Sequence, residues 1–164
     1  MMTGTPNVSN LPLWYQILTL LLILPFAWYD LRHHKVCNAA LLAFLPWCLL
    51  SLPIAQISAP WLPMSLLLLR CFMGFLSGSL MLFMISLATG GGIGGGDIKL
   101  IALLGMLYGS LHTFLVIFVA ALLVLIHMGL QFLHRRQHTR HIPFVPYLWG
   151  GCALVTLLML FAPA

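Results

Sequence analysis

The stretch that decides the interpretation of this chain is Gly90–Leu100, which reads GGGIGGGDIKL. Six of its first seven residues are glycine, and they interrupt a long apolar run because glycine has more backbone freedom than any other residue. Asp97 follows the glycines directly, and it is one of only two acidic residues in the chain; the other is Asp30. Since a carboxylate at the centre of a bilayer costs roughly 2.5–3.5 kcal/mol, an acid in an apolar sequence indicates a functional site. The stretch therefore predicts a functional loop in which Asp97 works together with Asp30.

The composition excludes a water-soluble globular protein. Of the 164 residues, 62% are hydrophobic and only 5% are charged, whereas a soluble domain carries about 25% charged residues. A chain of this length has room for about six membrane spans and little else. The net charge of +5 does not indicate a nucleic-acid partner, because the basic residues lie in short loops between apolar runs. We therefore expect an all-α integral membrane protein with about six transmembrane helices and a single domain, residues 1–164.

The apolar runs predict where these six helices lie. The expected spans cover residues 11–29, 36–55, 62–89, 97–109, 113–133 and 143–161. The fourth span is short, because its 13 residues reach only about 20 Å as a helix. Either this span begins below the membrane surface or the glycine run dips into the bilayer, where irregular backbone lies against protein or water. Asp97 is therefore expected to line a wet cleft.

The basic residues predict the orientation of the chain. Six of the seven lysines and arginines fall on one side of the predicted spans: Arg32, Lys35, Lys99, Arg135, Arg136 and Arg140. The positive-inside rule makes that side cytoplasmic. Both termini are then expected outside, and both aspartates lie at the cytoplasmic ends of their spans.

Two aspartates at one membrane face suggest acid–base chemistry. Two carboxylates within hydrogen-bond reach cannot both ionise, so they share one proton. The ionised one accepts a proton from water while the protonated one polarises a carbonyl, and water attacks a peptide carbon without a covalent enzyme intermediate. Gly94 and Gly96 are expected to provide positive-φ backbone or close approach of an extended substrate. Lys99 either favours the charged form of the pair or lies at the membrane interface.

Two other classes of protein stay open at this point. In a proton- or ion-coupled carrier, Asp97 would be a binding site beside a broken helix. In a scaffold for a pilus or secretion apparatus, both aspartates would be structural. A carrier needs an acid that is accessible from both faces, whereas the predicted acids lie at one face. A scaffold would tolerate Asp→Asn substitutions at Asp30 and Asp97.

No cofactor or metal is expected. The glycine run formally fits GxGxxG, but no strand precedes it, which argues against a dinucleotide site. His134, His138 and His141 have no carboxylate nearby to complete a set of metal ligands. The four cysteines are scattered without any CxxC spacing, so neither a zinc site nor a disulfide framework is expected.

The segment Gly94-Gly95-Gly96-Asp97-Ile-Lys-Leu100 resembles the GxGD signature, extended as GxGDxKL, of the type IV prepilin peptidases, which are intramembrane aspartic proteases. Two further segments resemble this family in the same chain order. Asp30-Leu-Arg32 followed by Val36-Cys37-Asn38 is similar to its first aspartate segment, with Cys37 where the family usually has proline. Ile142-Pro-Phe-Val-Pro-Tyr147 is similar to the Pro-Phe-Gly-Pro segment that opens the last helix, with Val145 in place of glycine. Tyr29-Asp30 also resembles the YD motif of signal-peptide peptidases, but the small size favours the prepilin branch.

The resemblance implies both an activity and a set of site residues. The catalytic pair would be Asp30 and Asp97; Gly94, Gly95, Gly96 and Lys99 would form the active-site loop, and Arg32, Asn38, Pro143 and Pro146 would support it. The implied reaction is removal of the leader peptide from a prepilin or pseudopilin precursor at the cytoplasmic face of a prokaryotic plasma membrane. No nucleic acid and no cofactor is implied, and membrane lipid is the other partner. Longer members carry a cytoplasmic insertion with paired CxxC motifs and also N-methylate the product. This chain has no such insertion, so a short form with peptidase activity alone is expected.

Overall fold

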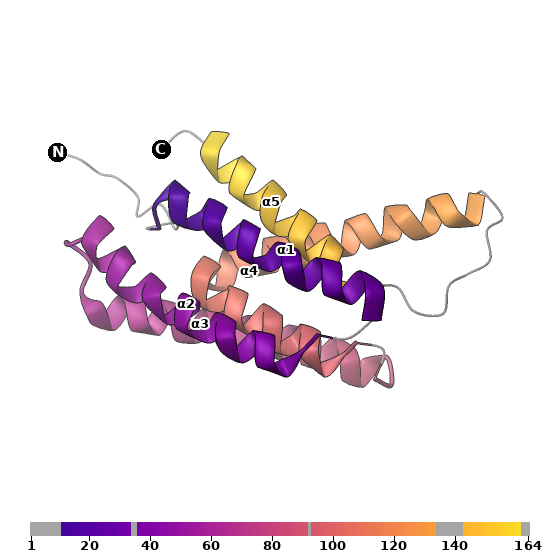
Figure 1. Cartoon of the computed structure of the whole chain (residues 1–164). Coiled ribbons are helices and arrows are strands. Elements are labelled where there is room, and N and C mark those ends of the chain that lie inside the picture. The colour runs from indigo at the N-terminus through magenta and orange to yellow at the C-terminus, as the bar shows by residue number, and fades with distance from the viewer. Residues whose placement is uncertain (1–10, 34–35, 92, 134–142, 162–164) are drawn as a thin grey trace.

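The computed structural model describes residues 11–33, 36–91, 93–133 and 143–161, and these form an all-helical bundle (Figure 1). The helices are α1 (Leu13–His33), α2 (Asn38–Ser58), α3 (Met64–Ala88), α4 (Gly95–Leu133) and α5 (Val145–Phe161). The first four are long and apolar enough to cross a membrane, and α5 is an apolar helix of 17 residues. The prediction of an all-α, multi-pass protein agrees with these helices, whereas six separate spans are not shown.

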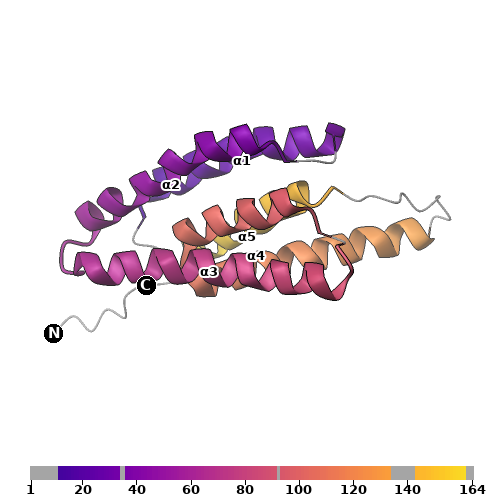
Figure 2. The same ribbon diagram turned by 90° about the horizontal axis from the view of Figure 1, so that it is seen from below.

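Helix α4 contains a sharp reversal at Gly109. This residue has φ 73° and ψ 171°, a region of backbone space that essentially only glycine adopts. A Cβ added to Gly78 of α3 would lie 2.9 Å from the Cγ2 atoms of both Ile101 and Thr113, although twelve residues of straight helix would separate these by about 18 Å. Figures 1 and 2 show the two halves of α4 running in nearly opposite directions. The expected link at residues 110–112 is wrong, because the helix resumes directly after the glycine.

The two halves of α4, residues 95–108 and 110–133, correspond to the fourth and fifth predicted spans. Both pack against α3, and glycines make this possible. A Cβ on Gly74 would overlap the carbonyl group of Gly105, and a Cβ on Gly105 would overlap that of Gly74. Small residues at such spacing let the backbones of membrane helices approach closely, so α3 and α4 form the tightest contact of the bundle.

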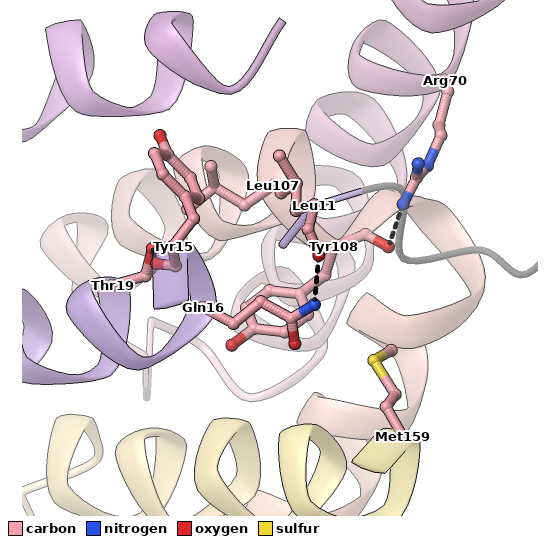
Figure 3. A pocket seen from close by; sticks show the side chains of 8 residues that line it. All are labelled: Leu11, Tyr15, Gln16, Thr19, Arg70, Leu107, Tyr108 and Met159. Carbon is pink, nitrogen blue, oxygen red and sulfur yellow. Dashed lines mark hydrogen bonds between the residues drawn. The ribbon is translucent and has the colours of Figure 1, made fainter. Parts of the chain in front are cut away.

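Arg70 of α3 lies beside the reversal of α4. Its Nη2 donates to the backbone carbonyl of Tyr108 at 3.5 Å, and Figure 3 shows the guanidinium directed at this carbonyl. A cation at the C-terminal end of a helical segment is favourable, by about 0.3–1 kcal/mol at exposed sites. The Tyr108 hydroxyl lies 3.1 Å from the Thr156 hydroxyl, which connects α4 to α5. This end of the bundle is remote from the glycine run, since Arg70 lies near the start of α3 and the glycines follow its end.

The end of α1, the start of α2 and the start of α4 meet at the opposite end of the bundle (Figures 1 and 2). Helix α1 packs against α5, and α2 packs against α3 and α4. The outward faces carry large apolar side chains, for example Trp28, Leu42 and Phe132. Such continuous apolar exposure indicates a surface that contacts lipid. Both acids, by contrast, lie at helix ends: Asp30 in the last turn of α1 and Asp97 in the first turn of α4.

Candidate active site

A cavity of about 350 Å³ lies where α1 ends and where α2 and α4 begin. It is lined by Asp30, Val36, Asn38, Gly94, Gly95, Gly96, Asp97 and Lys99. The two acids of the chain thus face one cavity, although they lie on different helices. Asn38 and the three glycines that the sequence singled out line it as well.

Asp30 lies in the last turn of α1 and is buried, with 4% of its surface exposed. Its Oδ2 accepts a hydrogen bond at 3.0 Å from the backbone N–H of Val145, the first residue of α5. The first N–H groups of a helix have no partner within the helix, and the positive end of the helix dipole favours a carboxylate. Pro146 has no N–H to satisfy, and the N–H of Tyr147 donates to the carbonyl of Phe144 at 3.1 Å. Asp30 is therefore held by the N-terminus of α5.

Asp97 lies in the first turn of α4, and it is partly buried at the cavity. Its backbone N–H donates to the carbonyl of Gly94 at 3.0 Å, which forms the first turn of the helix. An acidic residue in the first turn also complements the helix dipole. The carboxylates of Asp97 and Asp30 are close enough to interact electrostatically. Each acid of the cavity therefore lies at the N-terminal end of a helix, one at α4 and the other at α5.

The glycine run divides into two parts with different roles. The expected positive φ at Gly94 and Gly96 is wrong, because among the described glycines of the run it is Gly90 (64°) and Gly91 (90°) that have positive φ. The N–H of Gly91 donates to the carbonyl of Ser86 at 2.7 Å, and that of Gly90 to Leu87 at 3.3 Å. This pair of bonds is the Schellman arrangement that ends a helix. The first glycines therefore terminate α3.

The later glycines make room at the cavity. A Cβ on Gly96 would lie 2.7 Å from the Cβ of Val36 and 3.3 Å from its carbonyl oxygen, whereas nothing lies within 4 Å of one on Gly95. A Cβ on Gly94 would lie 3.4 Å from Oδ2 of Asp97, an ordinary contact distance. The close approach expected at Gly96 therefore exists, but it is made to Val36 of the chain itself.

Lys99 and Asn38 form one edge of the cavity. The Nζ of Lys99 donates to Oδ1 of Asn38 at 3.1 Å, so the start of α4 is joined to the first residue of α2. Both side chains present hydrogen-bonding groups next to the two carboxylates. One ammonium group, one amide and two acids thus line the same cavity.

Some predicted site residues lie elsewhere. Arg32 does not line the cavity; its guanidinium carbon lies 5.1 Å from the centroid of the Trp28 ring. Pro143 and Pro146 do not line it either, but they flank Val145, whose N–H contacts Asp30. Apart from the proline-rich start of α5, no pattern in the sequence indicated this backbone contact.

The part of the chain that the structure describes contains no cluster of potential metal ligands. Within those residues, no three histidine, cysteine or acidic side chains gather closely enough to hold an ion. His134, His138 and His141 lie outside the described residues.

Comparison with protein families identifies a relationship that agrees with this geometry. Residues 16–129 match the type IV leader peptidase family, a range that contains Asp30, the glycine run, Asp97 and Lys99 but not the segment around Val145. Neither curated proteins nor solved structures give a match to the chain. Membership of this family implies aspartic peptidase activity at the family level. Because the match covers more than half of the 164 residues, the chain belongs to the type IV leader peptidase family.

Proposed function

We propose that the protein is an intramembrane aspartic endopeptidase that removes the leader peptide from prepilin or pseudopilin precursors. The observation that carries this proposal is the cavity of about 350 Å³ that both Asp30 and Asp97 line. Family membership supports the substrate class, because leader peptides are what the family is named for.

The reaction follows from a pair of carboxylates that shares one proton. The ionised carboxylate takes a proton from a water molecule, and the oxygen of that water attacks the carbonyl carbon of the scissile peptide bond. The protonated carboxylate donates its hydrogen bond to the carbonyl oxygen, where negative charge develops. The C–N bond then breaks as the nitrogen of the leaving amine receives a proton, and the dyad returns to its starting state. Asp30 and Asp97 perform these two roles between them, and no covalent intermediate forms.

The proposed site lies at the cytoplasmic face of a prokaryotic plasma membrane. Arg32 and Lys99, two of the residues that the positive-inside rule counts, belong to the helix ends beside the cavity. If each half of α4 crosses the membrane, the proposed arrangement has six membrane-crossing segments and both termini outside.

The direct test is co-expression of the protein with candidate precursors, with loss of the leader followed by the change in gel mobility. The wild-type protein should shorten at least one precursor, and the Asp30→Asn and Asp97→Asn variants at matched membrane levels should not. Processing that persists in both variants would overturn the peptidase proposal. A scaffold would support assembly with either variant, and a carrier would leave every precursor at full length.

A further inference from the structure

An open apolar groove of about 410 Å³ adjoins the catalytic cavity, between α2, α3 and the first half of α4. Asn38 and Lys99 line both the cavity and the groove. Their hydrogen bond of 3.1 Å therefore lies at the boundary between the two. A second groove of about 500 Å³, between α1 and α2, shares no lining residue with the cavity. Of these two grooves, which described residues line, the one beside α3 is therefore the one that adjoins the cavity of the two aspartates.

Beyond this boundary the groove offers apolar surface alone. Its walls carry Leu42, Leu45, Phe75 and Leu103. The one further polar side chain is Ser79, and its hydroxyl already donates to the carbonyl of Phe75 at 2.8 Å. An occupant of the groove therefore needs no polar group there, and burying its apolar side chains against these walls is favourable.

The groove also has the direction that a membrane-embedded peptide needs. From Asn38 to Leu45, α2 advances seven residues, or about 10 Å along its axis. The groove accordingly leads from the carboxylates into the apolar part of the bundle. It is open to the lipid side, since Leu42 is 75% exposed.

We propose that this groove, which we call the α2–α3–α4 groove, binds an apolar segment of the peptide substrate next to its scissile bond. The proposal rests on the peptidase function proposed above. A peptide provides a polar backbone at the Asn38–Lys99 boundary and apolar side chains along the groove. An anionic lipid fits less well: its headgroup could pair with Lys99, but it would also lie next to the cavity that the carboxylates of Asp30 and Asp97 line. The substrate enters from the membrane, between α2 and α3.

Photo-crosslinking tests this assignment without requiring turnover. Benzoylphenylalanine is introduced at position 45, in the groove, and in a control protein at position 50, on the same helix but in the α1–α2 groove. Both proteins carry Asp97→Asn and are irradiated in membranes that contain a full-length precursor. We expect crosslinks from position 45 to the apolar segment of the precursor and none from position 50. Adducts only to lipid at position 45, or equal precursor crosslinks from both positions, would overturn the proposal.

Kinetics provide the second measurement. Leu45→Trp fills the groove and should raise KM for the full-length precursor about tenfold, the order of effect for one misfitting apolar contact. Leu50→Trp is the matched control and should leave KM unchanged. An unchanged KM in the Leu45→Trp variant would contradict the proposal.

The two experiments separate failure of the groove assignment from failure of the peptidase function. If the wild-type protein cleaves precursors but position 45 gives no crosslink, the groove assignment fails alone. If position 45 crosslinks but nothing is cleaved, the peptidase function fails alone.

Discussion

Asp30 and Asp97 both lie next to the N-terminal end of a helix, but Asp97 belongs to that helix whereas Asp30 does not. Asp97 lies in the first turn of its own helix, whereas Asp30 lies in the last turn of α1, where the dipole of that helix disfavours a negative charge. The N–H of Val145 at the start of α5 offsets this disadvantage. A carboxylate pair placed in this way can hold both a negative charge and a proton in an apolar protein. In the reaction proposed above, each carboxylate has a task that the other cannot perform.

Replacing either aspartate by asparagine should therefore abolish cleavage. Asparagine keeps the size of the side chain but cannot ionise, so Asp30→Asn and Asp97→Asn should each lower precursor processing by ~100-fold or more, the range that acid–base groups contribute. The double variant should be no worse than either single variant, because residues that act as one unit are not additive. Lys99→Gln should cost less, since Lys99 transfers no proton in the proposed reaction. The measurement is processing in membranes at matched expression, and substantial activity in either single variant would exclude the paired mechanism.

The contact between Gly96 and Val36 predicts a second effect at this scale. Gly96→Ala places a methyl group 2.7 Å from the Cβ of Val36, and such overpacking costs typically 1–3 kcal/mol. Processing should fall, and Val36→Gly in the same chain should restore part of it because the opposing Cβ is removed. Gly94→Ala should have a smaller effect, since its new methyl group meets Asp97 at an ordinary distance. Equal losses in the Gly96→Ala protein with and without Val36→Gly would contradict the steric explanation.

At the scale of whole helices, the reversal within α4 is what returns the chain toward the end of the bundle that holds the Asp30–Asp97 cavity. It depends on Gly109, whose backbone conformation excludes other residues, and on the close contact of Gly74 with Gly105. A straight helix of 39 residues would extend about 58 Å, about twice the thickness of the hydrocarbon core. The reversal converts this length into two segments that both pack on α3.

Gly109→Ala should therefore destabilise the protein by about 1–3 kcal/mol, the cost of a non-glycine residue in this region. The added methyl group would also lie 2.9 Å from Nε of Arg70. Gly129→Ala is the matched control on the same helix, because nothing lies within 4 Å of its added Cβ, and alanine is up to about 1 kcal/mol more favourable than glycine inside a helix. Thermal unfolding in detergent should show a lower midpoint for Gly109→Ala and an equal or higher midpoint for Gly129→Ala. The same midpoint for both would mean that Gly109 is not under strain.

The sequence predicted the helices well because apolar runs and span lengths follow directly from the membrane. It also led us to expect that Asp30 and Asp97 act together, since a chain with only two acids has few other uses for them. Both line one cavity, and their catalytic pairing stays a prediction. The turn at Gly109 was assigned to residues 110–112, because one glycine in an apolar run does not reveal its φ angle. Likewise, nothing in six neighbouring glycines distinguishes those that end α3 from one that packs on Val36. The contact of Val145 with Asp30 joins residues 115 positions apart, so it depends on the packing of α5.

For the whole molecule, the bend in α4 determines on which side of the membrane the chain ends. The chain reverses its direction from each segment to the next, in the order α1, α2, α3, first half of α4, second half of α4 and α5. Helix α5 therefore ends near the level at which α1 starts (Figures 1 and 2). If α4 crossed the membrane once, the end of α5 would lie on the side opposite to the start of α1. With two crossings, both ends lie on the same side. In the arrangement proposed above, the distribution of lysine and arginine makes that side the outer one.

Reporter fusions distinguish these two arrangements. We expect alkaline phosphatase fused after Phe161 to be active, because it would lie outside, and the same enzyme fused after Leu133 to be inactive. A fusion between α2 and α3, near residue 60, should be active as well, and it provides an internal reference for an outward position. Active fusions near residue 60 and after Leu133, together with an inactive one after Phe161, would mean that α4 crosses only once and that the reversal at Gly109 does not exist in the membrane. Inactive fusions both near residue 60 and after Phe161, with an active one after Leu133, would instead invert the orientation and put the Asp30–Asp97 cavity at the outer face.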